Sequence, residues 1–220
     1  MKKENTKIVI FDWGGVVESH KNGEYNCFTA RVDVINKLAK NKLDADLIIE
    51  KCNKCDYNNE TNKYISEINT KQEIQQWFKK QKEIFDLQCN YEEFYNVYQE
   101  EFDKVEYYKD VIKFAHSLKD KCKIGILSNL CSFDSPRIDK HYNPSKFDYV
   151  WLSFEMNCRK PNEEIYIMVE NDCKIKPKNI LFIDDAEENI NIAKKREWNV
   201  CLANGHELDK IKQRVAHFLK

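Results

Sequence analysis

The sequence lacks both a long hydrophobic run and a net charge of any size. No apolar stretch approaches the roughly 20 residues that a membrane-spanning helix needs. The 36 lysines and arginines nearly balance the 37 aspartates and glutamates, which leaves a formal net charge of -1. We therefore expect neither nucleic acid nor a membrane as a partner. The first apolar run, 8–11, is too short for the core of a signal peptide, so the sequence predicts a cytoplasmic protein.

The sequence also lacks the cysteine pattern of a disulfide framework or a zinc site. It has nine cysteines, an odd number, in a chain of 220 residues without an export signal, which favours free thiols. Only Cys52 and Cys55 have the spacing of a metal-binding pair, and no second pair or nearby histidines complete a zinc site. We expect these two thiols to be structural.

Five short apolar runs stand out in a sequence that shows no repeat and no low-complexity tract. They are separated by segments with helical periodicity or helix caps, such as a helix that Asn162 begins. This alternation predicts an α/β fold, a Rossmann-like, doubly wound parallel sheet. The runs are 7–11, 123–127, 149–152, 179–183 and 200–203, and the last two helices are expected at 186–197 and 206–220.

The interval 18–105 has a different character. It contains no convincing strand, and two capping boxes, 70–73 and 90–93, precede apolar residues at helical spacing. The sequence therefore predicts an inserted all-α cap at 18–105, with a core domain formed by 1–17 and 106–220.

Polar side chains follow four of the five apolar runs. Because the carboxyl ends of parallel strands meet at one edge of a sheet, we expect these side chains to converge there. A carboxylate that ends a buried strand is costly without a partner, which also favours a site. In chain order the residues are Asp12, then Ser128 with Asn129, then Lys160, then Asp184 with Asp185.

In four ordered motifs the sequence resembles the haloacid dehalogenase superfamily of hydrolases. Each motif is short, but all four occur in order after predicted strands, and the helical insertion lies where that superfamily places its cap. The first motif is most similar to that of phosphatases that read Asp-x-Gly-Gly/Asn-Val. The motifs are Phe11-Asp12-Trp13-Gly14-Gly15-Val16-Val17, Leu127-Ser128-Asn129, Arg159-Lys160-Pro161 and Phe182-Ile183-Asp184-Asp185.

Phosphoryl transfer needs an in-line nucleophile, a cation and fixed donors, and these residue types supply them. On this interpretation Asp12 attacks phosphorus and forms an aspartyl phosphate. Lys160 neutralises the phosphate and holds Asp12. The Ser128 hydroxyl and the Asn129 amide donate to phosphoryl oxygens.

The same edge is predicted to hold Mg²⁺, an ion that prefers oxygen ligands. Its expected ligands are Asp12, Asp184 and the backbone carbonyl of Gly14, with Asp185 binding directly or through water. Gly14 and Gly15 would allow a tight turn above the nucleophile. The sequence thus predicts a magnesium-dependent phosphomonoester hydrolase whose partner is a small phosphorylated metabolite. Nothing in it indicates an oligomeric state.

Position 14 departs from the pattern of most phosphatases that this chain resembles. They carry there an aspartate that protonates the leaving group, whereas this chain has Gly14. Haloacid dehalogenases also lack that aspartate, so hydrolysis of a carbon–halogen bond is an alternative. The adjacent Asp184 and Asp185 favour the phosphatase, because the two carboxylates would repel each other without a cation. A weakly catalytic phosphate-binding or regulatory relative is a second alternative.

Two places in the insertion are candidates for further roles at the site. Glu18 and His20 lie just past the glycine turn and are candidates to replace the missing acid, with an exposed loop histidine as the alternative. Arg31 is the only arginine of the insertion. It is a candidate to meet a substrate anion, with a helix-surface arginine as the alternative.

Two positions near the fourth motif remain open. Asn189 is expected either to orient Asp185 or to face solvent. Glu197 stands where proteins of this kind commonly have a glycine that ends the helix, which predicts an altered turn.

Overall fold

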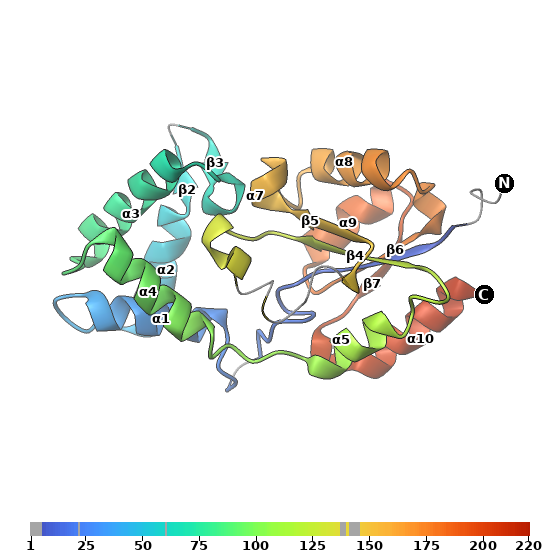
Figure 1. The fold of residues 1–220 in the computed structure, drawn as a ribbon, viewed down its shortest axis with the longest axis horizontal. Helices are drawn as coiled ribbons and strands as arrows, with labels where there is room; N and C mark the ends of the chain where they lie inside the picture. Colours follow the sequence, from blue (N-terminus) through green and yellow to red (C-terminus); the bar gives the residue numbers. More distant parts are fainter. Residues whose placement is uncertain (1–5, 22, 60, 137–139, 141–145) are drawn as a thin grey trace.

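A five-stranded parallel sheet lies at the centre of the molecule (Figure 1). The predicted Rossmann-like class is confirmed, and each strand begins and ends within one residue of its predicted run. The computed structural model describes residues 6–21, 23–59, 61–136, 140 and 146–220. In spatial order the strands are β5 (Tyr149–Leu152), β4 (Lys123–Ser128), β1 (Ile8–Phe11), β6 (Ile180–Asp184) and β7 (Asn199–Leu202).

Helices cover both faces of this sheet, above and below it in Figure 1. Alternate residues of β1 point to opposite faces, so Val9 and Phe11 pack into one apolar cluster and Ile8 and Ile10 into the other. One face is covered by α5 (Lys109–His116) and α10 (Leu208–Leu219), the other by α8 (Glu163–Cys173) and α9 (Glu187–Lys195). The two layers of helices bury both faces of the central strands from solvent.

The start of α8 follows the predicted capping. The side chain of Asn162 accepts a hydrogen bond from the Glu164 backbone and begins α8. Glu197, after α9, has a φ of 63°, in the left-handed region that favours glycine. Glu197 therefore keeps the backbone conformation that a glycine would take here, and the expectation of an altered turn is wrong.

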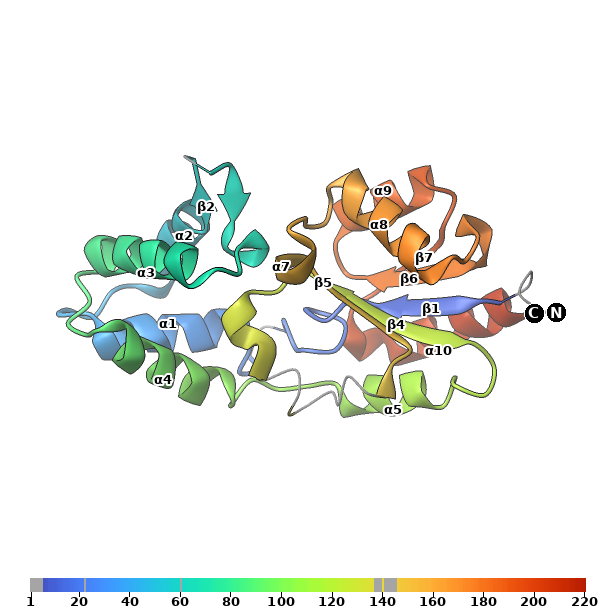
Figure 2. The same ribbon diagram turned by 45° about the horizontal axis from the view of Figure 1, so that its top comes forward.

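The interval 18–105 lies beside the sheet, at the left of Figures 1 and 2, and is mainly helical. Both predicted capping boxes are present, with Thr70 and Asn90 as the capping residues. Aromatic rings, among them Trp77 and Phe94, fill its apolar cluster, which also includes Phe133 from the short helix η2 (Ser132–Asp134). The helices are α1 (Cys27–Leu38), α2 (Ala45–Cys55), α3 (Lys71–Phe85) and α4 (Tyr91–Phe102).

One feature of this interval differs from the sequence expectation of helices alone. Two antiparallel strands of two residues each, β2 (Tyr57–Asn58) and β3 (Lys63–Tyr64), lie between α2 and α3. Strands this short show no period-2 pattern in a sequence, which is why they were not predicted. A short helix, η1 (Ile65–Glu67), follows them.

Hydrogen bonds join the interval 18–105 to the rest of the chain at several places. One is η2, where Gln99 Nε2 of α4 donates to Phe133 O (2.7 Å). Two others involve the linkers and η1. At the first, its two linkers pair with each other: Ser19 N donates to Glu106 O (2.9 Å), and Tyr108 N donates to Val17 O (2.8 Å). At the second, Ser153 Oγ of α7 (Ser153–Met156) donates to the Ser66 carbonyl of η1. The division into a core of 1–17 and 106–220 and a cap of 18–105 stays a prediction.

The remaining short helices are η4 (Pro177–Asn179) and η5 (Gly205–Glu207). In the described part of the chain, no helix combines the length and the apolar character that crossing a membrane requires.

Candidate active site

The central strands carry the polar residues that the sequence singled out. β1 pairs with β4 on one side and with β6 on the other, so the residues at their carboxyl ends share one edge. Asp12 directly follows β1, Ser128 ends β4, and Asp184 ends β6. All three side chains are buried. From β1 the chain adds β4 and β5 on one side of the sheet and then β6 and β7 on the other. This change of direction makes the edge a topological switch point, where ligands bind in such sheets.

Lys160 connects two of these carboxylates. Its Nζ lies 2.8 Å from Asp12 Oδ1 and 2.7 Å from Asp184 Oδ2, and its side chain is only 1% exposed. Burial acts to lower the pKa of Lys160, but the two carboxylate charges outweigh it and raise that pKa. The ammonium therefore stays charged and fixes the Asp12 carboxylate from one side.

Asn129 holds the backbone of Lys160 in place. Asn129 Nδ2 donates to Lys160 O, and Lys160 N donates to Asn129 Oδ1, both at 2.8 Å. The side-chain amide of Asn129 is thus used to join the end of β4 to the loop that carries Lys160. Its predicted role as a donor to a phosphoryl oxygen stays a prediction.

Asn189 orients Asp184, which differs from the two expectations stated for it. Its Nδ2 lies 3.0 Å from both carboxylate oxygens of Asp184, and the side chain is buried. Ala186 N also donates to Asp184 Oδ1 (2.8 Å). The prediction of Asp185 as the target is wrong. Both carboxylates precede the first turn of α9, so sequence spacing alone does not show which of them the amide reaches.

The glycine turn after Asp12 is shaped by its contact with Asp185. Gly15 has a φ of +72°, and a Cβ at this position would lie 1.9 Å from Asp185 Oδ2. Glycine is required here both for the backbone conformation and for the approach of the carboxylate. Gly14 does not have a positive φ, so only the second glycine of the pair needs the left-handed region.

His20 covers Gly14. A Cβ at position 14 would lie 2.8 Å from His20 Cε1, so the imidazole fills the space of the side chain that is missing there. His20 Nδ1 lies 3.7 Å from Asp185 Oδ2. Burial acts to lower the pKa of His20, but its contacts with Asp185 and Cys27 outweigh it and raise that pKa to about 11. The expected alternative of an exposed loop histidine is wrong, since only 27% of the side chain is exposed.

Three carboxylates form a group suited to a divalent cation. Asp12, Asp184 and Asp185 each offer an oxygen, and these oxygens lie within 4.8 Å of one another. Burial raises the pKa of Asp12 to about 8, against the opposing charge of Lys160. Three carboxylates outnumber the two neighbouring cations, the Lys160 ammonium and the His20 imidazolium beside Asp185, and all three offer oxygen ligands, which fits Mg²⁺.

Comparison with protein families decides the classification. Residues 29–203 match the family model described as haloacid dehalogenase-like hydrolase. The chain belongs to this family. The superfamily that the four motifs indicated is therefore confirmed, and with it a hydrolase. A search of curated proteins found no match.

Solved structures of haloacid dehalogenase (HAD) proteins share the fold of this HAD-like chain. A HAD family enzyme from Bacteroides thetaiotaomicron, solved in complex with magnesium and inorganic phosphate, is 19% identical, with a TM-score of 0.68 over 91% of this chain and 95% of that one. A predicted HAD-like family hydrolase from Porphyromonas gingivalis is 21% identical, with a TM-score of 0.67 over 96% and 98%. The L-2-haloacid dehalogenase of Xanthobacter autotrophicus is 15% identical, with a TM-score of 0.61 over 89% and 76%. At these identities the likeness establishes the fold alone.

Arg31 of this HAD-like chain is paired within the insertion, and its candidate role of meeting a substrate anion stays a prediction. Its Nη1 and Nη2 donate to the two carboxylate oxygens of Asp56 at 2.7 and 2.6 Å. Burial acts to lower the pKa of Arg31, but the paired carboxylate outweighs it and raises that pKa. The partner lies 25 residues away in the sequence, and no local pattern indicates such a pair.

Arg159 is a cation that the sequence analysis left without a role. Its guanidinium carbon lies 4.0 Å from the centre of the Tyr64 ring in β3, so it links the loop before Lys160 to the interval 18–105. Its Nε is buried and has no hydrogen-bond partner among the described residues. Its place beside Lys160 in the third motif is the signal that would have singled it out.

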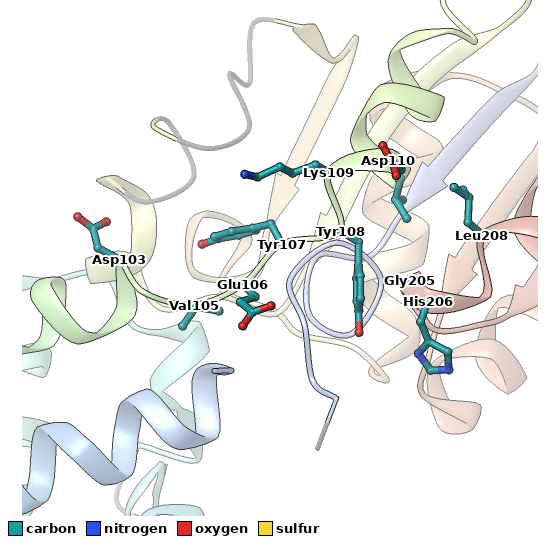
Figure 3. Close-up of a pocket in the computed structure, with 11 residues that line it drawn as sticks. Asp103, Val105, Glu106, Tyr107, Tyr108, Lys109, Asp110, Gly205, His206 and Leu208 are labelled. Carbon is teal, nitrogen blue, oxygen red and sulfur yellow. The ribbon is translucent and has the colours of Figure 1, made fainter. Parts of the chain in front are cut away.

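A cavity of about 760 Å³ opens at the second linker, away from the strand ends. Figure 3 shows Tyr107 and Lys109 extending toward Asp103, whereas Tyr108 points downward and its ring lies beside His206. None of the strand-end residues lines this cavity. The candidate active site is therefore defined by the edge of the sheet and not by this hollow.

Proposed function

We propose that this HAD-like hydrolase is a magnesium-dependent phosphatase that cleaves a small phosphomonoester through a phosphorylated Asp12. The observation that carries the proposal is the buried Lys160 bridge between Asp12 and Asp184, with Asp185 completing a group of three carboxylates. A nucleophile, a fixed cation and an oxygen-lined metal site are the parts that phosphoryl transfer requires.

The contacts of Asp12 indicate which of its oxygens reacts. Trp13 N donates to Oδ1 (2.6 Å), and Lys160 Nζ lies 2.8 Å from the same oxygen. We therefore assign Oδ2 as the nucleophile. It attacks phosphorus, the bond from phosphorus to the leaving oxygen breaks, and water then hydrolyses the aspartyl phosphate to release inorganic phosphate.

The surrounding residues have separate tasks in this mechanism. Lys160 keeps Asp12 oriented, and the Ser128 hydroxyl donates to the transferring group. Asn129 and Asn189 fix Lys160 and Asp184 and need not touch the substrate. Mg²⁺ bound by the three aspartates and the Gly14 carbonyl would neutralise charge on the phosphoryl oxygens.

The dehalogenase alternative rests on Gly14, the residue in place of the usual acid. A dehalogenase of the kind considered needs no metal, whereas the three carboxylates here outnumber Lys160 and His20 and favour a further cation. The magnesium and phosphate complex of the Bacteroides thetaiotaomicron enzyme, a protein of the same fold, also supports the phosphatase.

We also propose that 18–105 acts as a cap over the site. The paired linkers give it a two-stranded connection to the core, and Arg159 and Ser153 contact it close to Lys160 in the chain. Closure of such a segment excludes water from the reaction.

Hydrolysis of a chromogenic aryl phosphate tests the proposal, because a good leaving group does not need the acid missing at position 14. We expect turnover that stops when Mg²⁺ is chelated. The Asp12→Asn variant should have no turnover, and the matched surface variant Asp209→Asn should keep it. An intact-mass increase of one phosphoryl group should appear in the wild type and not in Asp12→Asn.

Other results would select an alternative. Wild-type turnover in Asp12→Asn would overturn the mechanism. Release of halide from a 2-haloacid without metal would identify a dehalogenase, and phosphate binding without turnover would identify a regulatory relative. If turnover is found, a screen of phosphorylated metabolites would identify the substrate.

A further inference from the structure

A second group of potential metal ligands lies where the first linker meets the insertion. Glu18, His20 and Cys27 each offer one ligand atom, and these atoms lie within 4.8 Å of one another. Glu18 and His20 belong to the linker, whereas Cys27 is the first residue of α1. In the described part of the chain, this is the one such group besides the three aspartates. Neither group includes Cys52 or Cys55, the pair with metal-like spacing.

The chemistry of this group differs from that of the three aspartates. A thiolate, an imidazole and a carboxylate are the ligands that Zn²⁺ and Co²⁺ take in proteins, whereas Mg²⁺ prefers oxygen ligands throughout. Three protein ligands also leave a fourth tetrahedral position open. Ligand type therefore separates the two groups by the metal that each selects.

Two of the three side chains are already held in position. Trp13 Nε1 donates to Glu18 Oε2 (2.9 Å), and Glu18 is only 3% exposed. The His20 ring packs against Phe28, with 5.3 Å between ring centroids, on the side of the chain where α1 begins. Ligands that are fixed before the metal arrives lose little freedom on binding.

The position of Cys27 favours its thiolate form. Asn26 caps α1 by accepting from Phe28 N and Thr29 N, and Cys27 is therefore in the first turn of a 12-residue helix. The positive end of the helix dipole favours an anionic side chain there, and the thiolate is the form of cysteine that binds metal.

We propose that Glu18, His20 and Cys27 form a binding site for a thiophilic divalent cation, Zn²⁺ or Co²⁺, which displaces a proton from His20. The site shares no ligand with the adjacent oxygen-lined site of Asp12, Asp184 and Asp185. A cation there would tie the first linker to α1. It would also engage the imidazole that covers Gly14. The existence of this metal site does not depend on the chain being a phosphatase. We also expect Zn²⁺ to inhibit turnover, and this consequence rests on the proposed function.

Titration of the full chain with Co²⁺ in saturating Mg²⁺ tests the site. Sulfur ligation gives a thiolate-to-cobalt charge-transfer band in the near ultraviolet, and Co²⁺ bound by the aspartates alone does not. We expect this band to saturate at one equivalent, to vanish when Zn²⁺ displaces Co²⁺, and to be absent in Cys27→Ser. His20→Ala should weaken Co²⁺ binding at least about tenfold.

The matched control is Cys131→Ser, which changes another half-buried cysteine and should keep the band. Circular dichroism would verify that each variant is folded. Absence of the band in the wild type would overturn the proposal, as would its persistence in folded Cys27→Ser or its loss in Cys131→Ser. Because the readout is spectroscopic, failure of the proposed phosphatase activity would leave this result unaffected.

Discussion

The sheet region and the interval 18–105 both bury charged side chains, but they use them differently. At the sheet, Lys160 is surrounded by more carboxylate than it can neutralise. In the insertion, Arg31 is matched by the single carboxylate of Asp56, and the Glu101 carboxylate is paired with two half-exposed lysines, Lys37 and Lys104, so neither carboxylate lacks a cation. An unbalanced buried cluster indicates a site for an external charge, whereas a balanced one indicates packing.

Removing the lysine from the unbalanced cluster should have the largest effect. Lys160→Met leaves three carboxylates without their ammonium and frees Asp12, so we expect turnover of an aryl phosphate to fall by about 10²–10³-fold or more. Steady-state kinetics would measure the loss, with the melting temperature as the control for folding. Turnover within about tenfold of the wild type would contradict the assignment of Lys160.

The matched change in the balanced cluster should act on stability instead. Arg31→Met leaves the Asp56 carboxylate unpaired, and because the pair is about one-fifth exposed we expect a loss of about 2–3 kcal/mol in the free energy of unfolding. Urea denaturation would measure it. Turnover of the folded variant should stay within about twofold, and a selective loss of turnover would place Arg31 at the substrate.

The strand-end cluster was predictable from the sequence because the position of each of its residues depends only on the apolar run directly before it. A polar residue directly after an apolar run lies at the edge of a parallel sheet whatever the details of packing, so Asp12, Ser128 and Asp184 could be placed from the pattern alone. The five strands were predictable for the same reason, since each is a continuous apolar run between caps or turns.

The rest depends on contacts between residues far apart in the chain. The Arg31 pair with Asp56, the cation–π contact of Arg159 with Tyr64 and the His20 ring over Gly14 have no periodic signature. The two-residue strands β2 and β3 are too short to show one. These features follow from how the insertion packs, which single-residue patterns do not encode.

A variant at the junction of the two regions would sharpen the comparison. Gly14→Asp restores the acid of related phosphatases, but its Cβ would clash with the His20 ring. We expect a loss of about 1–3 kcal/mol in stability from this overpacking. Thermal denaturation should show that Gly14→Asp combined with His20→Ala recovers most of the loss. Equal destabilisation in the single and double variants would mean that His20 does not occupy this space.

The smallest effect we expect is the acid sensitivity of the insertion. Burial acts to raise the pKa of Glu101, but its bonds to Lys104, Lys37 and Tyr25 lower it to about 2, from an ordinary value of 4.5. Its contribution to stability is therefore complete above pH 4.5 and is lost as the pH falls toward 2. We expect it to be about 1–2 kcal/mol, because both lysines are half exposed.

Urea denaturation at pH 7 and at pH 3 would measure this contribution. Glu101→Gln should be less stable than the wild type at pH 7, and the difference should shrink at pH 3. If the stability difference between the wild type and Glu101→Gln grew as the pH fell, the predicted direction of the Glu101 pKa shift would be wrong.

The pairing of the two linkers has a consequence for how the chain tolerates change. Val17 and Tyr108 are hydrogen-bonded neighbours, so the segment between them leaves and re-enters the core at a single point. The entropic cost of closing a loop grows only slowly with the number of residues in it, so an insertion between two neighbouring residues can change in length at little cost in stability. The core can therefore carry a longer, shorter or entirely different insertion at this point while β1 keeps its place between β4 and β6. The strand ends and their carboxylates can stay unchanged while the interval 18–105 is replaced as a unit.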